Sequence, residues 1–133
     1  MKYNFEEILD SFMSIYWLRP ENGFWTALRS KVLRQLDMQG DIIDISCGDG
    51  LFSFIHNGGQ IDMSFDMFSD VGYLNEVGEK HKDMFDIVSD QYKPVITRKP
   101  CKKYAVATDW KEALLKKAEA LGFYDRLLVH DNN

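Results

Sequence analysis

The sequence predicts an α/β fold in which short parallel strands alternate with helices. An apolar segment at 42–45 runs directly into a loop that contains two glycines, Gly48 and Gly50, as a strand does when it enters a ligand-binding turn. A second apolar segment, 104–109, is followed by a helical pattern and then by a third strand-like segment, 123–131. The order strand, helix, insertion, strand, helix, strand favours a parallel sheet with right-handed crossovers.

Two helices are expected before the first strand, within residues 1–40. Apolar residues recur every three or four positions in 5–16, which predicts an amphipathic helix that ends before Pro20. A second helix is expected over about 23–36. Its inward-facing positions are predicted to be Trp25, Leu28, Val32 and Leu36.

The helix after the second strand is expected between 111 and 121, with Gly122 at its end. Its apolar face is predicted to consist of Leu114, Leu115, Ala118 and Leu121. The positions expected to face water are Lys111, Glu112, Lys116, Lys117 and Glu119.

Residues 57–103 are expected to form an insertion between the first helix and the second strand. Ile61, Met63 and Phe65 alternate with polar residues, a pattern typical of a half-exposed strand. Five cations and two prolines follow within 93–103, without the helical or aromatic pattern of a nucleic-acid-binding module. A loop region of this length in a compact domain is usually functional or partly disordered.

Length and composition exclude several classes of protein. A chain of 133 residues with 45% hydrophobic residues fits one globular domain but is short for a complete enzyme of this fold class. A net charge of −5 argues against a nucleic-acid partner. No apolar run approaches ~20 residues and no signal peptide is evident, so we expect a cytoplasmic protein with no membrane partner. Two cysteines, Cys47 and Cys101, are too few for a disulfide framework or a zinc site, so no metal is expected.

The most specific motif runs from Asp44 to Ser53 and reads Asp-Ile-Ser-Cys-Gly-Asp-Gly-Leu-Phe-Ser. It resembles the first motif of class I S-adenosylmethionine-dependent methyltransferases, Asp-x-Gly-Cys-Gly-x-Gly-x-x-Ser. One position departs from that motif, because Ser46 stands where the family has its first glycine. A dinucleotide fingerprint would have its third glycine where Ser53 stands, so the loop points away from NAD.

Residues 108–125 are similar to the second motif of the same family and the helix that follows it. The resemblance therefore covers 41–55 and 104–133, in the order that the family has. It implies a partial Rossmann-like three-layer fold whose first three strands lie in the order 3-2-1. It also implies that 1–133 is a single, incomplete domain, the cofactor-binding half of a methyltransferase, which alone is expected to be inactive.

The same resemblance implies a site for S-adenosylmethionine. Gly48 and Gly50 would approach the methionine part, Asp109 would bind the ribose, and Asp131 would lie beside the adenine. The full set of expected cofactor-binding residues is Asp44, Ser46, Cys47, Gly48, Gly50, Asp109, Trp110, Asp131 and Asn132. No catalytic residue is indicated.

Two aspartates compete for the ribose. Asp66 lies 16 residues beyond Gly50, the ordinary spacing, but follows an alternating strand. Asp109 lies 59 residues beyond Gly50, yet it ends a buried-looking strand and begins an amphipathic helix, so it is preferred. With Glu112 it also has the pattern of a helix cap, and both roles can hold at once.

The methyl acceptor is expected to be a small molecule or glycan-related. The alternatives are a non-catalytic cofactor-binding or interaction domain and, less favoured, an NAD-dependent reductase. The family's fourth strand, which pairs with the first, has no counterpart in the sequence. Strand 41–45 would then have an open edge, so we expect a homodimer through this edge or a cover formed by part of 60–103.

Overall fold

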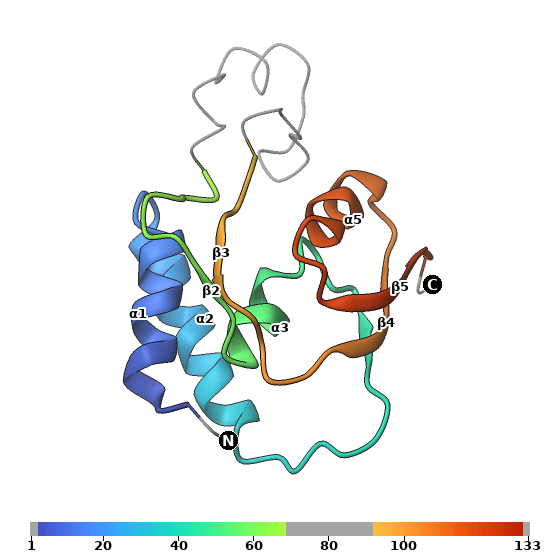
Figure 1. Cartoon of the computed structure of the whole chain (residues 1–133), viewed down its shortest axis with the longest axis horizontal. Coiled ribbons are helices and arrows are strands. Elements are labelled where there is room, and N and C mark those ends of the chain that lie inside the picture. Colours follow the sequence, from blue (N-terminus) through green and yellow to red (C-terminus); the bar gives the residue numbers. More distant parts are fainter. Residues whose placement is uncertain (1–2, 69–91, 132–133) are drawn as a thin grey trace.

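The computed structural model describes residues 3–68 and 92–131. The helices are α1 (Phe5–Ile15), α2 (Pro20–Leu33), α3 (Leu51–His56) and α5 (Glu112–Glu119). The strands are β1 (Ile43–Ile45), β2 (Gln60–Ile61), β3 (Ile96–Arg98), β4 (Tyr104–Asp109) and β5 (Tyr124–Val129). Figure 1 shows α1 and α2 at one end of the molecule and β4, β5 and α5 at the other. Among the described helices, none has the length and apolar character needed to cross a membrane.

The main sheet contains three parallel strands in the order β1-β4-β5. The α/β class and the parallel pairing are confirmed. Numbered along the chain, the order differs from the expected 3-2-1, because β2 and β3 pair with each other in a separate antiparallel sheet and the main sheet takes the first, fourth and fifth strands. The segments expected as strands at 42–45, 104–109 and 123–131 correspond to β1, β4 and β5. The strands that do lie side by side are the apolar segments on either side of the insertion.

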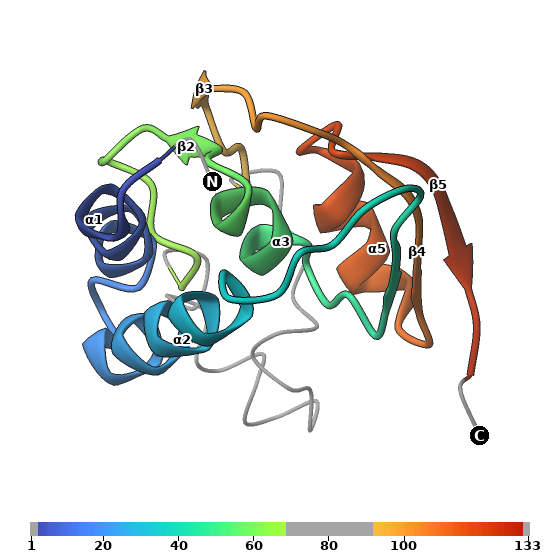
Figure 2. The ribbon, with the colours of Figure 1, turned by 90° about the horizontal axis from the view of Figure 1, so that it is seen from below.

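Only one face of the main sheet is covered by described helices. Figure 2 shows α3 and α5 on one side of β4 and β5, with α1 and α2 beyond α3. On the opposite face Ile43, Ile45 and Leu128 are exposed. Parallel sheets are normally covered on both faces. The described residues therefore build one helical side of the expected three-layer arrangement.

The core joins α1 to α3 and α3 to the sheet. Ile8, Phe12 and Ile15 are buried on one face of α1, as the periodicity predicts, and Phe12 stacks on Phe52 of α3 with ring centroids 5.9 Å apart. On the far side of α3, Phe54 meets Phe123 edge to face at 6.2 Å. These contacts hold the loop between β1 and α3 in a fixed position.

The expected inward face of the second helix is wrong. Trp25 is 60% exposed and Val32 is 64% exposed. Leu28 is half-buried, and Leu36 is exposed and lies beyond the end of α2. The buried positions are instead the small residues Gly23, Thr26, Ala27 and Ser30. The physical reason is the close approach of α1, since a Cβ on Gly23 would lie 3.1 Å from the carbonyl oxygen of Phe12.

The described parts of the insertion, 57–68 and 92–103, contain a short antiparallel sheet and a contact with α5. β2 contains only Gln60 and Ile61 of the expected alternating strand, and it pairs with β3. Tyr92, in the second described part of the insertion, lies with its ring centroid 4.9 Å from Nζ of Lys117. Lys117 was expected to face water and is only 3% exposed, because the returning chain covers this side of α5.

Candidate functional site

The loop between β1 and α3 contains three residues in the left-handed backbone region. Their φ angles are 59° for Ser46, 60° for Gly48 and 78° for Gly50. Glycine adopts this region without strain, whereas other residues are uncommon there. Ser46 thus has the backbone conformation that a glycine would favour, at the position where the resembling motif has one. This loop, residues 46–50, is called the glycine loop below.

The two glycines of the loop have different surroundings. A Cβ on Gly48 would meet no atom within 4 Å, so the backbone here is open to a ligand. A Cβ on Gly50 would lie 3.0 Å from the ring of Tyr124 and 3.2 Å from Cβ of Ala118. Gly50 therefore lets α5 and β5 pack closely beneath the loop, while Gly48 leaves space above it.

Asp109, at the end of the central strand β4, fixes the glycine loop. Its Oδ2 accepts a hydrogen bond from the N–H of Gly48 at 3.0 Å, and its Oδ1 accepts one from the N–H of Lys111 at 2.9 Å. The side chain is 4% exposed. The hydrogen bond to Lys111 replaces the expected cap, because α5 has Lys111 at its N-cap position and no side-chain cap. Each carboxylate oxygen keeps one lone pair for a further donor.

Asp66 is held in a different environment. Its oxygens accept the N–H groups of Leu18 and Phe68, which fixes the segment after β2 against the end of α1. Neither of these two hydrogen bonds involves the glycine loop. The structure thus brings Asp109, and not Asp66, to this loop.

Asp44 of β1 lies under the loop and is held by two hydroxyls. Ser53, the last residue of the motif, donates to its Oδ2, and Tyr124 donates to the same oxygen at 2.6 Å. Burial, and next the charge of Asp44, raise the pKa of Tyr124, so its proton stays on the phenol. The sequence analysis missed Tyr124, because a tyrosine at the start of a strand carries no signal of a partner 80 positions away.

Carboxylates surround Cys47. Burial, followed by the charges of Asp44, Asp109 and Asp49, raises the pKa of the Cys47 thiol to about 12. A thiol with this pKa is uncharged at neutral pH and is a poor nucleophile. The same charges make the space around the glycine loop electronegative, which favours a cationic ligand group over an anionic one.

Asp49, which the sequence analysis did not single out, lies at the start of α3. Its Oδ1 accepts the N–H of Leu51 at 3.0 Å. Burial raises the pKa of Asp49, against the effects of this hydrogen bond and of the Lys117 charge. The position of Asp49 between the two glycines of the motif is the feature of the sequence that could have marked it as a site residue. Asp49 thereby occupies the helix N-terminus, where a dinucleotide-binding protein holds a phosphate.

Three large apolar side chains are exposed near the carboxyl end of the sheet. They are Ile45, Trp110 and Val129. Nζ of Lys111 lies over the Trp110 ring, 5.2 Å from its centroid. Asp131 is exposed at the end of the described chain, and Asn132 lies outside the described residues. Exposed apolar side chains therefore lie near the polar glycine loop, with Ile45 and Val129 on opposite faces of the sheet.

No family model matches the chain, and no curated protein and no solved structure matches it either. Within 3–68 and 92–131, no group of three or more His, Cys, Asp or Glu residues could hold a metal ion.

Proposed function

We propose that the glycine loop binds S-adenosylmethionine and that the chain is the cofactor-binding portion of a cytoplasmic class I methyltransferase of Rossmann-like fold. The observation that carries the proposal is the conformation of the loop. Ser46, Gly48 and Gly50 all have left-handed φ angles, and the loop is tied to Asp109 at the end of the adjacent strand. A loop with this backbone brings main-chain atoms close to a ligand.

Charge favours S-adenosylmethionine over NAD. The sulfonium and ammonium groups of S-adenosylmethionine outnumber its single carboxylate, whereas NAD carries an anionic pyrophosphate. Asp44, Asp49 and Asp109 gather around the loop, and Asp49 accepts the first N–H of α3. A pyrophosphate would have to displace or oppose that carboxylate, so the NAD-dependent reductase is the weaker hypothesis.

In the proposed complex Gly48 lies against the methionine part and Asp109 accepts the ribose hydroxyls with its remaining lone pairs. The exposed ring of Trp110 offers a face on which the adenine can stack. Methyl transfer needs the sulfonium methyl and the acceptor atom to be held in line, so the chain's contribution is positioning. A small-molecule or glycan-related acceptor is proposed on the resemblance alone, and no residue is assigned as catalytic.

A non-catalytic interaction domain remains the second candidate. The sheet face with Ile43 and Ile45, which no described helix covers, and the exposed Trp25 on α2 favour it, because apolar surfaces of this kind occur where proteins meet partners. Such a domain would not require cofactor binding at the glycine loop.

Calorimetric titrations with S-adenosylmethionine, S-adenosylhomocysteine and NAD test the proposal. We expect the first two to bind and NAD to bind more weakly. Binding of NAD with equal or higher affinity would overturn the cofactor assignment. Absence of binding by all three would support the interaction domain instead.

A matched pair of glycine variants locates the site. Gly48 and Gly122 have φ angles of 60° and 58°, and a Cβ on either would meet no atom within 4 Å. Gly48→Ala and Gly122→Ala should therefore destabilise the fold by a similar amount, about 1–2 kcal/mol. Only Gly48→Ala should weaken cofactor binding, by about tenfold or more, because it fills the space above the loop. Equal effects of both variants on binding would place the site elsewhere.

A further inference from the structure

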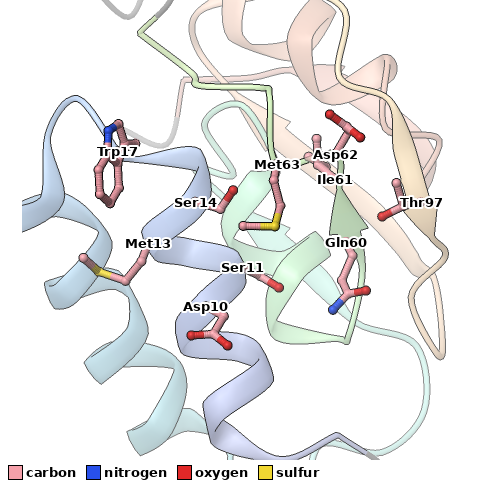
Figure 3. A pocket seen from close by; sticks show the side chains of 10 residues that line it. All are labelled: Asp10, Ser11, Met13, Ser14, Trp17, Gln60, Ile61, Asp62, Met63 and Thr97. Carbon is pink, nitrogen blue, oxygen red and sulfur yellow. The ribbon is translucent and has the colours of Figure 1, made fainter.

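A cavity lies between α1 and the chain that leaves β2 (Figure 3). Its volume is about 810 Å³, which is within the range of ligand sites, roughly 300–1,000 Å³. Asp10 and Trp17 come from the α1 side, and Asp62 and Met63 come from the segment after β2. No residue that lines this cavity belongs to the glycine loop. The cavity is therefore separate from the proposed cofactor site.

The lining of the cavity is acidic. Among the residues that the structure describes, it contains Asp10 and Asp62 but no lysine, arginine or histidine. In the described part of the chain, neither carboxylate forms an ion pair. Hydrogen bonds from the hydroxyl and the N–H of Ser64 lower the pKa of Asp62, which keeps its carboxylate ionised. Two negatively charged side chains from different elements thus belong to the lining of one cavity.

The hydroxyl groups on the α1 side add acceptor capacity. The hydroxyl of Ser11 donates its proton to the carbonyl oxygen of Glu7 at 2.8 Å, so its own oxygen can only accept from a ligand. The Oγ of Ser14 is buried and has no hydrogen-bond partner among the described residues. The polar lining is therefore suited to a ligand that donates hydrogen bonds or carries positive charge.

The apolar lining is also suited to a cation. Trp17 is 75% exposed and Met63 is 84% exposed, although both are large and apolar. Met13 of α1 is also part of the lining, and Trp17 follows the end of that helix (Figure 3). An aromatic face attracts organic cations, and methionine thioethers are soft, adaptable surfaces against methyl and methylene groups.

We propose that the cavity between α1 and β2 binds a small alkylammonium cation. The negative charges of Asp10 and Asp62 attract the cation to the cavity, and Trp17 and Met63 offer apolar surface to its carbon atoms. A free anion or a phosphate group is disfavoured by the two carboxylates. The proposal rests on this cavity alone and is independent of the proposed methyltransferase function.

The test uses choline and its uncharged isostere, 3,3-dimethylbutan-1-ol, with the full chain. Binding is followed by NMR through the indole N–H signal of Trp17, which is assigned with Trp17→Phe. We expect choline to shift the Trp17 signal saturably and to leave the Trp110 signal in place. The uncharged alcohol should bind at least about tenfold more weakly than choline. No shift with choline, or equal affinity for the alcohol, would overturn the proposal.

Three carboxylate variants show whether the charge acts at this site. Asp10→Asn and Asp62→Asn should each weaken choline binding by about fivefold, as expected for a partly exposed charge pair. Asp37→Asn is the matched control, since Asp37 is exposed and bonds only to Gln39 among the described residues. It should leave the affinity unchanged. An equal loss in all three variants would show general electrostatic attraction and would overturn the site.

Discussion

The carboxylate of Asp109 and the backbone of Gly48 are joined by a hydrogen bond of 3.0 Å across 61 positions of sequence. The other oxygen of the same carboxylate accepts the N–H of Lys111 at 2.9 Å. One buried side chain therefore sets the glycine loop against the end of the central strand. Both partners of the Asp109 carboxylate are N–H donors, so a substitution at position 109 must keep two acceptor oxygens to satisfy them.

Asp109→Asn should destabilise the protein and weaken the proposed cofactor binding. An amide has only one acceptor oxygen, so its NH₂ group would face either Gly48 N–H or Lys111 N–H. A buried donor left without a partner costs about 1–3 kcal/mol, which urea unfolding would measure. We also expect cofactor affinity to fall by about tenfold, from loss of the charge-assisted bonds.

Asp66→Asn is the matched control for this change, because Asp66 also accepts two backbone N–H groups, from Leu18 and Phe68. It lies in more exposed surroundings, where water can replace a lost bond. A smaller loss of stability and unchanged cofactor affinity are expected. A reversed result, with affinity lost at position 66 and kept at 109, would contradict the assignment of Asp109.

Gly50→Ala should destabilise more than Gly122→Ala. Both positions have left-handed φ angles, but only at Gly50 would the added Cβ lie 3.0 Å from the Tyr124 ring and 3.2 Å from Ala118. We expect an additional loss of about 1–3 kcal/mol from overpacking. Thermal or chemical unfolding of the two variants measures the difference, and equal stabilities would show that α5 and β5 can move away from the loop.

Two substitutions on α2 distinguish its buried face from its exposed face. Ala27 is buried against α1, so Ala27→Leu should cost about 1–3 kcal/mol of stability. Trp25 is exposed, so Trp25→Gln should change stability by about 0.5 kcal/mol or less. Chemical unfolding measures both. The opposite ranking would mean that the aromatic side of α2 packs inward, as the periodicity alone predicts.

Stability should decrease as the pH falls from about 6.5 to about 4, through His56. The His56 ring is buried and stacks on Phe52. Its Nδ1 is hydrogen-bonded to Oγ of Ser30 at 2.8 Å. Burial, and next the charges of Arg34 and Lys102, lower its pKa from 6.5 to about 4. Between these values the unfolded chain binds more protons than the folded one, so protonation favours unfolding, by on the order of 1–2 kcal/mol.

The His56 contribution is measured by comparing urea unfolding of the wild type and His56→Gln at pH 7 and pH 4. The carboxylates contribute equally to both proteins, so the difference isolates the histidine. A variant with the same pH dependence as the wild type would contradict this origin.

The open edge of β1 predicts association. β1 pairs only with β4 among the described residues, and the described strands of the insertion pair with each other rather than with β1. Residues 69–91, part of the segment expected as an alternative cover for this edge, lie outside the described residues. We therefore retain the homodimer through this edge as a prediction. Sedimentation should show a dimer that Ile43→Lys weakens and that Val95→Lys, a control at another exposed apolar position, does not. A monomer at all concentrations would contradict it.

Local patterns were enough to predict part of the fold. The buried face of α1 and the succession β4, α5 and β5 follow from periodicity within short stretches of sequence. The inward face of α2 was mispredicted because it depends on how closely α1 approaches at Gly23. Burial of Lys117 was missed for the same kind of reason, since Tyr92 reaches it from a distant segment.

In the candidate site, too, some features follow from local sequence patterns and others depend on contacts between distant segments. The left-handed positions at Gly48 and Gly50 are what a glycine-rich motif predicts. The hydrogen bonds that Asp44 accepts from Ser53 and Tyr124 depend on the packing of α3 and β5 against β1. Such contacts join residues of ordinary type, so no motif marks them.

The position of β4 between β1 and β5 has a consequence for the order in which the molecule folds. β4 reaches β5 through one short helix, whereas β1 reaches β4 only after the chain between Ile45 and Tyr104 has closed on itself. Closing a longer segment costs more chain entropy, and contacts between distant segments form slowly. We therefore expect the unit of β4, α5 and β5 to assemble first and β1 to dock last. The glycine loop acquires its shape only in that final step, so the ability to hold a ligand is the last property the folding chain gains and the first that local unfolding removes.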